Sequence, residues 1–215
     1  MTPNKEDYLK CIYELGQENA KISNKKIAQG MQVSAPAVSE MIKKMLNQEW
    51  IIKDKVVGYY LTDKGLKLIA NLYRKHRLIE VFLINQLSYT SQEVHQEAEV
   101  LEHTVSDNFI DRLDERLGFP VFCPHGGTIP RKDQPLNEIN TRTLNQITEP
   151  GKYQLSRIHD QYHLIQYLES HQLSIQTVFE LQSIDSYAKT YLITYQDKSL
   201  IIPENIAKEI YVSEL

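Results

Sequence analysis

Carboxylate and imidazole side chains gather in one short stretch of the sequence, EAEVLEH, which runs from Glu97 to His103. On an α-helix, Glu99, Glu102 and His103 would fall within a narrow arc, because successive residues turn by about 100°. His95 would join them one turn earlier. The apolar residues of the same stretch cluster on a different arc. The spacing therefore predicts a stripe of oxygen and nitrogen ligands beside a core-facing stripe.

This stretch also has a simpler interpretation, in which its charged residues are only the solvated face of a helix. Glu99 and His103 are spaced i, i+4, which is an ordinary stabilising pair on a helix surface. The same residue types also build metal-dependent hydrolases. However, the sequence contains no HExxH, no nucleophile motif and no glycine-rich phosphate loop, so we predict that the protein is not an enzyme.

The composition predicts a cytoplasmic protein. The 215-residue chain is 41% hydrophobic, which is enough to build the cores of one to three small domains. It has no apolar run long enough to span a bilayer, and its start, MTPNKEDYLK, lacks the pattern of a signal peptide. Cys11 and Cys123 are far apart and form no disulfide framework, so we expect a reducing compartment and no membrane partner.

The charge is distributed unevenly along the chain. The net charge is −4, but residues 1–72 carry 11 Lys and no Arg against 8 Asp and Glu, which gives +3 and leaves −7 for the remainder. A basic first third on an acidic protein predicts one nucleic-acid-binding module attached to other domains.

The first segment predicts three helices followed by a β-hairpin. EDYLKCIYEL and NKKIAQGM have helical patterns, and SAPAVSEMIKKMLNQ adds a third helix with Ser34 as its N-cap and Pro36 in its first turn. WIIKDK and GYYLT are β-rich runs joined by a turn that ends in Gly58. This order is typical of a winged helix-turn-helix domain that binds double-stranded DNA, although a helical protein-interaction domain is an alternative.

DNA contacts are expected around the start of the third helix. Small residues there would let the helix enter the major groove, where Pro36 or Ala37 can touch a thymine methyl group. Nearby lysines would contact phosphates, which set the register rather than the sequence preference. The predicted DNA-binding residues are Lys25, Lys26, Ser34, Ala35, Pro36, Ala37, Ser39, Lys43 and Lys44.

Two further segments follow the winged helix. LKLIANLYRKHRLIEVFLINQL and SQEVHQEAEVLEHTVSDNFIDRLDERLG predict two long helices, whose apolar faces a two-fold dimer would cover. YQLSRI, VFELQSI, TYLITYQ and KSLIIP then predict short strands of a small SH3-like β-barrel, with one helix at DQYHLIQYLESH. The predicted fold class is therefore mainly α with a small C-terminal β domain.

Several of these stretches resemble the diphtheria toxin repressor (DtxR/MntR) family, in its manganese- and iron-responsive streptococcal branch. They are EDYLKCIYEL, VSAPAVSEMIKKM, YYLTDKG, RKHRLIEVFL and VHQEAEVLEHTVSD. The resemblance covers nearly the whole chain. It implies a homodimeric regulator, usually a repressor of metal-uptake genes, that a divalent cation activates for operator binding. The implied domains are a winged helix-turn-helix at 1–72, a helical metal-binding and dimerisation domain at 73–140, and an SH3-like, FeoA-like domain at 141–215.

The resemblance also implies a primary metal site. Its ligands in this sequence would be Asp7, His76, Glu99, Glu102 and His103. In some members the residue that matches His95 binds as well. The shorter manganese regulators have a carboxylate three residues after their first aspartate, and here Lys10 stands at that position. A cation cannot be a ligand, so a paired-ion centre is not expected.

A second metal site is expected around Glu80, which the resemblance implies as a ligand and which lies one turn after His76. The loop FCPHGG offers Cys123 and His125, and Asp160 stands where a predicted strand gives way to a helix. The predicted set is Glu80, Cys123, His125 and Asp160, with His95 as a possible fifth ligand. Asp160 could instead cap the helix that follows, and the sequence leaves both roles open.

The ligand types narrow the choice of ion. Three carboxylates and two imidazoles in the primary set suit Mn²⁺ or Fe²⁺, while Zn²⁺ would bind at least as tightly in vitro. The mixed secondary set would also accept Zn²⁺. The remaining alternative is a winged-helix regulator that senses an organic ligand, in which the His and Glu side chains would be merely solvated.

Overall fold

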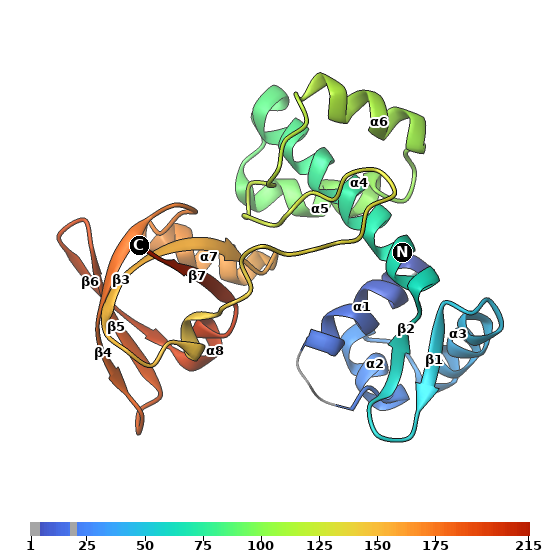
Figure 1. Cartoon of the computed structure of the whole chain (residues 1–215), viewed down its shortest axis with the longest axis horizontal. Coiled ribbons are helices and arrows are strands. Elements are labelled where there is room, and N and C mark those ends of the chain that lie inside the picture. Colours follow the sequence, from blue (N-terminus) through green and yellow to red (C-terminus); the bar gives the residue numbers. More distant parts are fainter. Residues whose placement is uncertain (1–4, 18–20) are drawn as a thin grey trace. The chain divides into compact units, whose positions relative to one another are not determined.

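The computed structural model describes residues 5–17 and 21–215 and divides into two compact units (Figure 1). The first unit comprises Met1–Arg74 together with Pro130–Leu136, and the second comprises Lys75–Ile129 together with Asn137–Leu215. The connection that leads to the C-terminal sheet is therefore divided between the units: Pro130–Leu136 belongs to the first unit, and the chain from Asn137 onward belongs to the second.

The first unit has the predicted order of a winged helix-turn-helix domain. The hydroxyl of Ser23 caps one helix by accepting from the N–H of Lys26, and Ser34 caps the next by accepting from the N–H of Ala37. The elements are α1 (Lys5–Gln17), α2 (Asn24–Met31), α3 (Ala35–Asn47), β1 (Ile51–Asp54) and β2 (Gly58–Leu61). The three predicted helices and the β wing are confirmed.

Apolar faces of the three helices and the base of the wing form the core of this unit. Its fully buried members include Leu9, Ile12, Ile27, Met45 and Ile51, and Leu136 packs against them. The wing begins its second strand at Gly58, whose φ is 85°. A Cβ atom there would lie 1.9 Å from the carbonyl oxygen of Ile22, so only glycine fits this turn.

The helical part of the second unit differs from the prediction in one respect. The long helix α4 (Asp63–Leu87) is confirmed, and the boundary between the two units falls within it. The second predicted long helix is wrong, because the chain forms two helices, α5 (Ser91–Leu101) and α6 (Asp107–Arg116). The reason is an N-cap inside the apolar pattern: the hydroxyl of Ser106 accepts from the N–H of Phe109 and starts a new helix.

The C-terminal part of the second unit is a five-stranded antiparallel sheet with the order β6-β5-β4-β3-β7 (Figure 1). The four predicted strands and the predicted helix are confirmed. The elements are β3 (Gly151–Ile158), α7 (Tyr162–Ser170), β4 (Val178–Asp185), β5 (Thr190–Tyr195), β6 (Lys198–Pro203), α8 (Glu204–Ala207) and β7 (Ile210–Glu214). The sequence pattern did not single out β7, which pairs with β3 as far as Ile158 and so holds the end of that strand.

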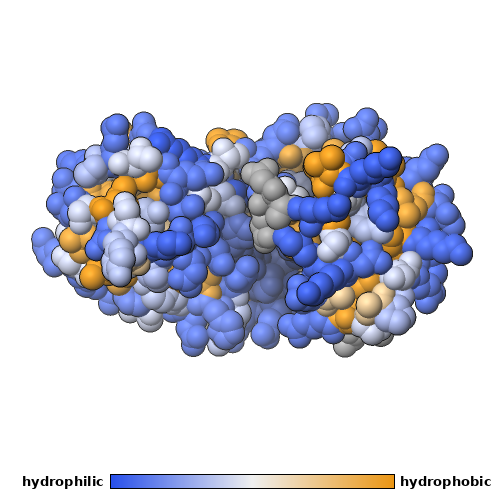
Figure 2. Space-filling model, turned by 90° about the horizontal axis from the view of Figure 1, so that it is seen from below, coloured by the Kyte–Doolittle hydropathy of each residue, from blue (hydrophilic) through white to orange (hydrophobic). Residues whose placement is uncertain are grey.

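The connection before the sheet contributes to its core. A short 3-10 helix, η1 (Leu144–Gln146), buries Leu144, and Ile147 is buried beside it, together with Leu164 and Leu168 of α7. On the face drawn in Figure 2, polar residues predominate and apolar residues form small separate patches. Within the described residues, no helix combines the length and the apolar character needed to cross a membrane.

Candidate metal centre

Five segments of the second unit carry predicted metal ligands. The helix α4 carries His76 and Glu80 one turn apart, and α5 carries His95 and Glu99 at the same spacing. The other three segments are the turn after α5, the loop after α6 and the corner between β3 and α7. They carry, in this order, Glu102 with His103, Cys123 with His125, and Asp160. Asp7 lies in the first turn of α1, in the first unit, so its place in the primary site stays a prediction.

The imidazole of His76 is buried at the centre of these segments. Its Nδ1 lies 2.5 Å from Oε2 of Glu102, while its Nε2 lies 3.0 Å from Oδ2 of Asp160 and 3.3 Å from Oε1 of Glu80. One ring therefore contacts a residue of the predicted primary set on one side and two residues of the predicted secondary set on the other.

His95, which the sequence offered only as a possible ligand, lies among the main ones. Its Nδ1 is 2.8 Å from Oδ2 of Asp160, and its Nε2 is 3.4 Å from Oε1 of Glu99. The packing of α5 against α7 brings them together, because Asp160 lies just before α7. Ligand atoms of His76, Glu80, His95 and Asp160 all lie within 4.8 Å of one another.

A second group shares Glu80 with the first. Ligand atoms of Glu80, Cys123 and His125 also lie within 4.8 Å of one another, and all three residues are buried. Nδ1 of His125 is 3.0 Å from Oε1 of Glu80 and 3.5 Å from Oδ1 of Asp160. The structure thus brings together Glu80, Cys123, His125 and Asp160, the four residues that the sequence proposed as a secondary set.

The remaining predicted primary ligands in this unit flank the same cluster. Nε2 of His103 lies 3.3 Å from Oε1 of Glu102, which is itself buried. Glu99 contacts His95 as described and has a half-exposed side chain. In the turn after α5, Glu102 therefore contacts both His76 and His103.

Several donor atoms of the cluster lack the hydrogen bonds that buried polar groups require. Both carboxylate oxygens of Glu80, both ring nitrogens of His125, Nδ1 of His95 and Oδ1 of Asp160 have no hydrogen-bond partner of acceptable geometry among the described residues. Such orphaned groups are rare in proteins because each loses its hydration without replacement. A divalent cation would coordinate them, and the mixture of nitrogen, oxygen and sulfur donors fits one.

The electrostatics of the cluster also favour a cation. Burial alone would lower the pKa of His95, but the carboxylates of Asp160 and Glu99 beside the ring raise it to about 9. Burial would likewise lower the pKa of His125, yet the charge of Glu80 and the neighbouring Cys123 raise it well above its ordinary value. The carboxylates thus draw positive charge onto these rings, and a metal ion would supply that charge in place of protons.

The alternative role of Asp160 as a helix cap is wrong. The helix α7 begins at Tyr162 with Gln161 in the N-cap position, and no side chain makes a capping hydrogen bond there. The carboxylate of Asp160 is instead directed at the rings of His76 and His95.

The predicted DNA-binding residues lie on α2, on the N-cap of α3 and on the exposed face of α3. The side chains of Ser39 and Lys44 are among those that make contacts within the chain. The hydroxyl of Ser39 donates to the carbonyl of Ala35 and accepts from the side-chain amide of Asn24. Nζ of Lys44 lies 2.6 Å from Oε1 of Glu40. The other predicted positions are Lys25, Lys26, Ser34, Ala35, Pro36, Ala37 and Lys43.

Known protein families match the chain in the order of its segments. Residues 1–58 match the profile described as iron dependent repressor, N-terminal DNA binding domain. Residues 62–131 match iron dependent repressor, metal binding and dimerisation domain, and residues 142–214 match the FeoA domain. The chain is also 33% identical over 118 residues to the HTH-type transcriptional regulator MntR of Bacillus pumilus. The aligned region covers 55% of this chain and 81% of that protein.

Solved structures extend the similarity to the full length. The metal-dependent transcriptional regulator MtsR is 70% identical with a TM-score of 0.90, and the match covers 100% of both chains. The repressor ScaR, described as manganese-activated and solved with bound Zn²⁺, is 52% identical with a TM-score of 0.95, covering 99% of this chain and 100% of that one. The chain belongs to the DtxR/MntR family of metal-dependent transcriptional repressors.

This membership decides between the readings that the sequence left open. The protein is a metal-dependent, DNA-binding transcriptional repressor, and its partners are a divalent metal, operator DNA and a second copy of the chain. Its C-terminal sheet is the SH3-like FeoA domain. The relatives are transcriptional regulators, and MtsR is described as metal-dependent.

The tip of the repressor's wing carries a feature that the sequence reasoning missed. Val56 and Val57 are 76% and 50% exposed, although valine is usually buried. The carboxylate of Asp54 accepts hydrogen bonds from the N–H groups of both valines and holds this turn. The signal was present in KDKVVG, an apolar pair in a turn with a lysine on either side of the aspartate.

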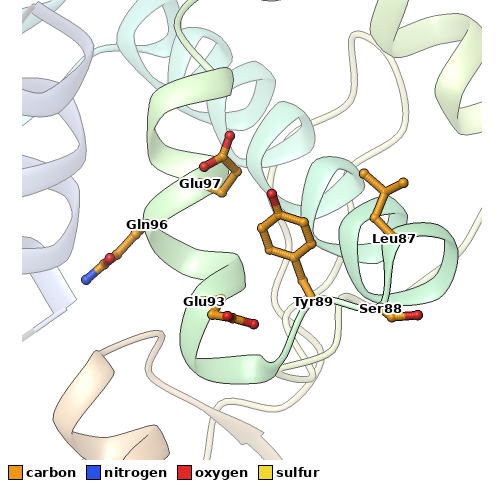
Figure 3. Close-up of a pocket in the computed structure, with 6 residues that line it drawn as sticks. All are labelled: Leu87, Ser88, Tyr89, Glu93, Gln96 and Glu97. Carbon is orange, nitrogen blue, oxygen red and sulfur yellow. The ribbon is translucent and has the colours of Figure 1, made fainter.

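An open hollow of about 470 Å³ lies elsewhere on the repressor, between the end of α4 and α5 (Figure 3). In Figure 3 the ring of Tyr89 stands between Glu97 and Leu87. The hollow is lined by Leu87, Ser88, Tyr89, Glu93, Gln96 and Glu97. This lining contains neither His nor Cys and none of the predicted ligands.

Proposed function

We propose that this protein is a cytoplasmic repressor of metal-uptake genes that Mn²⁺ or Fe²⁺ activates for operator binding. The observation that carries the proposal is the convergence of buried imidazole, carboxylate and thiol groups, in which Glu80 and His125 have side-chain atoms without a hydrogen-bond partner among the described residues. Mostly oxygen and nitrogen donors suit these two ions. The likeness to ScaR, a manganese-activated repressor, supports Mn²⁺, and its Zn²⁺-bound form supports Zn²⁺ as an occupant in vitro. The protein acts by binding and not by catalysis.

Two ion positions are proposed. The primary one uses Asp7, His76, Glu99, Glu102 and His103, and the secondary one uses Glu80, Cys123, His125 and Asp160 with His95. The assignment of Asp7 rests on the family resemblance, and the contacts of His76 with both Glu102 and Asp160 support an arrangement in which the two positions share one imidazole.

The ion would act by ordering one arrangement of the protein among several. Asp7 belongs to α1 of the DNA-binding unit, whereas the other primary ligands belong to the second unit. An ion bound by both would limit their relative motion. In a two-fold dimer this sets the spacing of the two recognition helices, which must match one DNA turn of about 34–36 Å.

For DNA recognition, α3 would enter the major groove and the wing would contact the neighbouring backbone. Lys25, Lys26, Lys43 and Lys44 would neutralise phosphates, and Ser34, Ala35, Pro36, Ala37 and Ser39 would approach the bases. The domains would span residues 1–72, 73–140 and 141–215.

The test is operator binding by the purified protein across a series of divalent metals at fixed salt, because phosphate contacts make affinity steeply salt-dependent. Equilibrium dialysis against Mn²⁺ would count bound ions in parallel. We expect one or two ions per chain, and operator binding that is lost with a chelator and restored by Mn²⁺ or Fe²⁺. Operator binding that persists unchanged without bound metal would contradict the proposal.

A further inference from the structure

A partly buried carboxylate outside the metal cluster, Glu138, contacts two arginines from distant parts of the chain. Its Oε1 accepts from Nη2 of Arg77 at 2.5 Å and lies 3.1 Å from Nη1 of Arg157. The three side chains are each only about a tenth exposed. Ion pairs on a protein surface contribute little, but a desolvated pair with direct hydrogen bonds fixes geometry.

The same carboxylate also holds the loop after α6. Oε2 of Glu138 accepts from the backbone N–H of Thr128 at 3.0 Å, and the carbonyl of Thr128 accepts from Arg77. The N–H of Ile139 in turn donates to the hydroxyl of Thr128 at 3.2 Å. The loop and the connection after it are therefore joined by the side chain of Glu138 and by the backbone N–H of Ile139.

Each of these three contacts lies beside a predicted metal ligand. Arg77 directly follows His76 on α4, Thr128 closes the loop that carries His125, and Arg157 precedes Asp160 at the end of β3. One carboxylate thus contacts all three chain segments that supply the secondary set. Glu138 itself is not among the clustered ligands.

The surroundings of Arg157 make its position rigid. Its guanidinium carbon lies 3.5 Å from the centre of the Tyr211 ring, and the hydroxyl of Tyr211 is 2.6 Å from Nε2 of His159. Arginine stacked on an aromatic ring and held by a carboxylate loses little freedom per hydrogen bond. The strand end that presents Asp160 is therefore clamped on two sides.

The glycines of the loop show how closely the segments approach. A Cβ atom at Gly126, whose φ is 79°, would lie 2.1 Å from the carbonyl oxygen of Ser156. A Cβ at Gly127 would lie 2.7 Å from the guanidinium carbon of Arg77. Any side chain at these positions would separate the loop from β3 and α4, which is why the pair of glycines follows His125 directly.

We propose that Glu138 is a positioning residue of the metal cluster: by holding Arg77, Thr128 and Arg157 together, it sets the distances between the ligands on α4, in the loop and at Asp160. This rests on the proposed metal-binding function. Residues that orient metal ligands typically change metal affinity by about 10–100-fold when they are replaced. Glu138 acts through its neighbours and does not touch the ion.

The test is calorimetric titration of the metal-free protein with Mn²⁺, comparing wild type, Glu138→Gln, Asp160→Asn and Glu214→Gln. Glutamine keeps the size of the side chain and removes its charge. Glu214 pairs with Arg142 on the surface of the same compact unit and serves as the matched control. We expect Glu138→Gln to weaken, by about 10–100-fold, the same binding step that Asp160→Asn removes, while Glu214→Gln behaves as wild type.

The outcomes separate this inference from the proposed function. If wild type binds no Mn²⁺, the proposed function itself fails. If wild type binds and Glu138→Gln binds with unchanged affinity, only the positioning role is overturned. If Glu138→Gln does not fold, Arg157→Lys replaces it, since lysine keeps the charge but loses the fork and the stacking on Tyr211. Weakened Mn²⁺ binding by folded Arg157→Lys would support the role, and unchanged binding would overturn it.

Discussion

Nε2 of His76 lies 3.0 Å from Oδ2 of Asp160, although 84 residues separate the two in the chain. The contact joins α4 to the corner between β3 and α7, so a helix of the dimerisation domain and the FeoA domain share one cluster of ligand atoms. The other nitrogen of the same ring contacts Glu102. The predicted primary and secondary sets are therefore connected through His76.

The shared ring predicts an unusual effect of His76→Ala. Removing the imidazole should weaken Mn²⁺ binding at both positions by about 10-fold or more, because the ring contacts ligands of each. Equilibrium dialysis against Mn²⁺ measures this. His163→Ala, which changes an exposed histidine of α7, should bind as wild type. Loss of a single binding step, with the other unchanged, would contradict the sharing of His76.

Asp7→Ala tests the coupling between metal and DNA. The substitution should leave a folded dimer that still binds metal through the ligands of the second unit, but operator affinity should no longer rise with Mn²⁺. Gel-shift titrations with and without Mn²⁺, and sedimentation to check the dimer, measure these effects. Glu6→Ala, on the same turn of α1, is the control and should keep the metal response. A full metal response by Asp7→Ala would rule the coupling out.

Two adjacent lysines of α3 should differ in their effect on DNA binding. Lys43→Ala should weaken binding to every sequence and reduce the salt slope by about one, as expected for a phosphate contact. Lys44→Ala should have a smaller effect, because Lys44 is already paired with Glu40 at 2.6 Å. Affinities at several salt concentrations measure both. A changed sequence preference at constant slope for Lys43→Ala would show that its role is different.

Val56→Ser tests the exposed tip of the wing. Since Val56 is 76% exposed, the substitution should alter the free energy of unfolding by no more than about 0.5 kcal/mol. Operator affinity should nevertheless fall, because the wing tip would lose an apolar contact with DNA. Val178→Ser, at a 46% exposed position on β4, should leave DNA binding unchanged. Equal operator affinities for wild type and Val56→Ser would exclude a contact by the wing tip.

Glu138 should make the stability depend on pH. Burial alone would raise the pKa of Glu138, but the charges of Arg77 and Arg157 lower it below its ordinary value. Because the pKa is lower in the folded state, ionised Glu138 contributes to the free energy of unfolding at pH values above the unfolded-state pKa of about 4.3. This contribution is lost as the pH falls through the folded-state pKa.

Glu138→Gln should therefore destabilise the metal-free protein most near pH 7 and progressively less as the pH falls below about 4. Urea unfolding of both proteins across this range, in the presence of chelator, measures the difference. The exposed pair of Glu214 with Arg142 provides the comparison, and Glu214→Gln should show little change at any pH. A destabilisation by Glu138→Gln that is constant with pH would exclude the ionic contribution.

The sequence by itself determined the elements and the ligand types. Ser34 and the spacing of apolar residues predicted α3, and the spacing of His76 with Glu80 and of His95 with Glu99 placed each pair on one helix face. These features depend on residues within one or two turns of each other, so local propensity and capping are sufficient. The same local logic failed at Ser106, where a cap interrupts an otherwise continuous apolar pattern.

Tertiary structure alone decided which of these residues meet. Asp160 reaches His76 and His95 because β7 pairs with the end of β3 and α5 packs against α7, and no local pattern encodes either contact. Glu138 gave no signal, since a single glutamate in a polar connection is ordinary in sequence. Its role emerges only where the chain folds Arg77, Thr128 and Arg157 around it. Such contacts depend on the packing of segments far apart in the chain, whereas helix periodicity depends only on near neighbours.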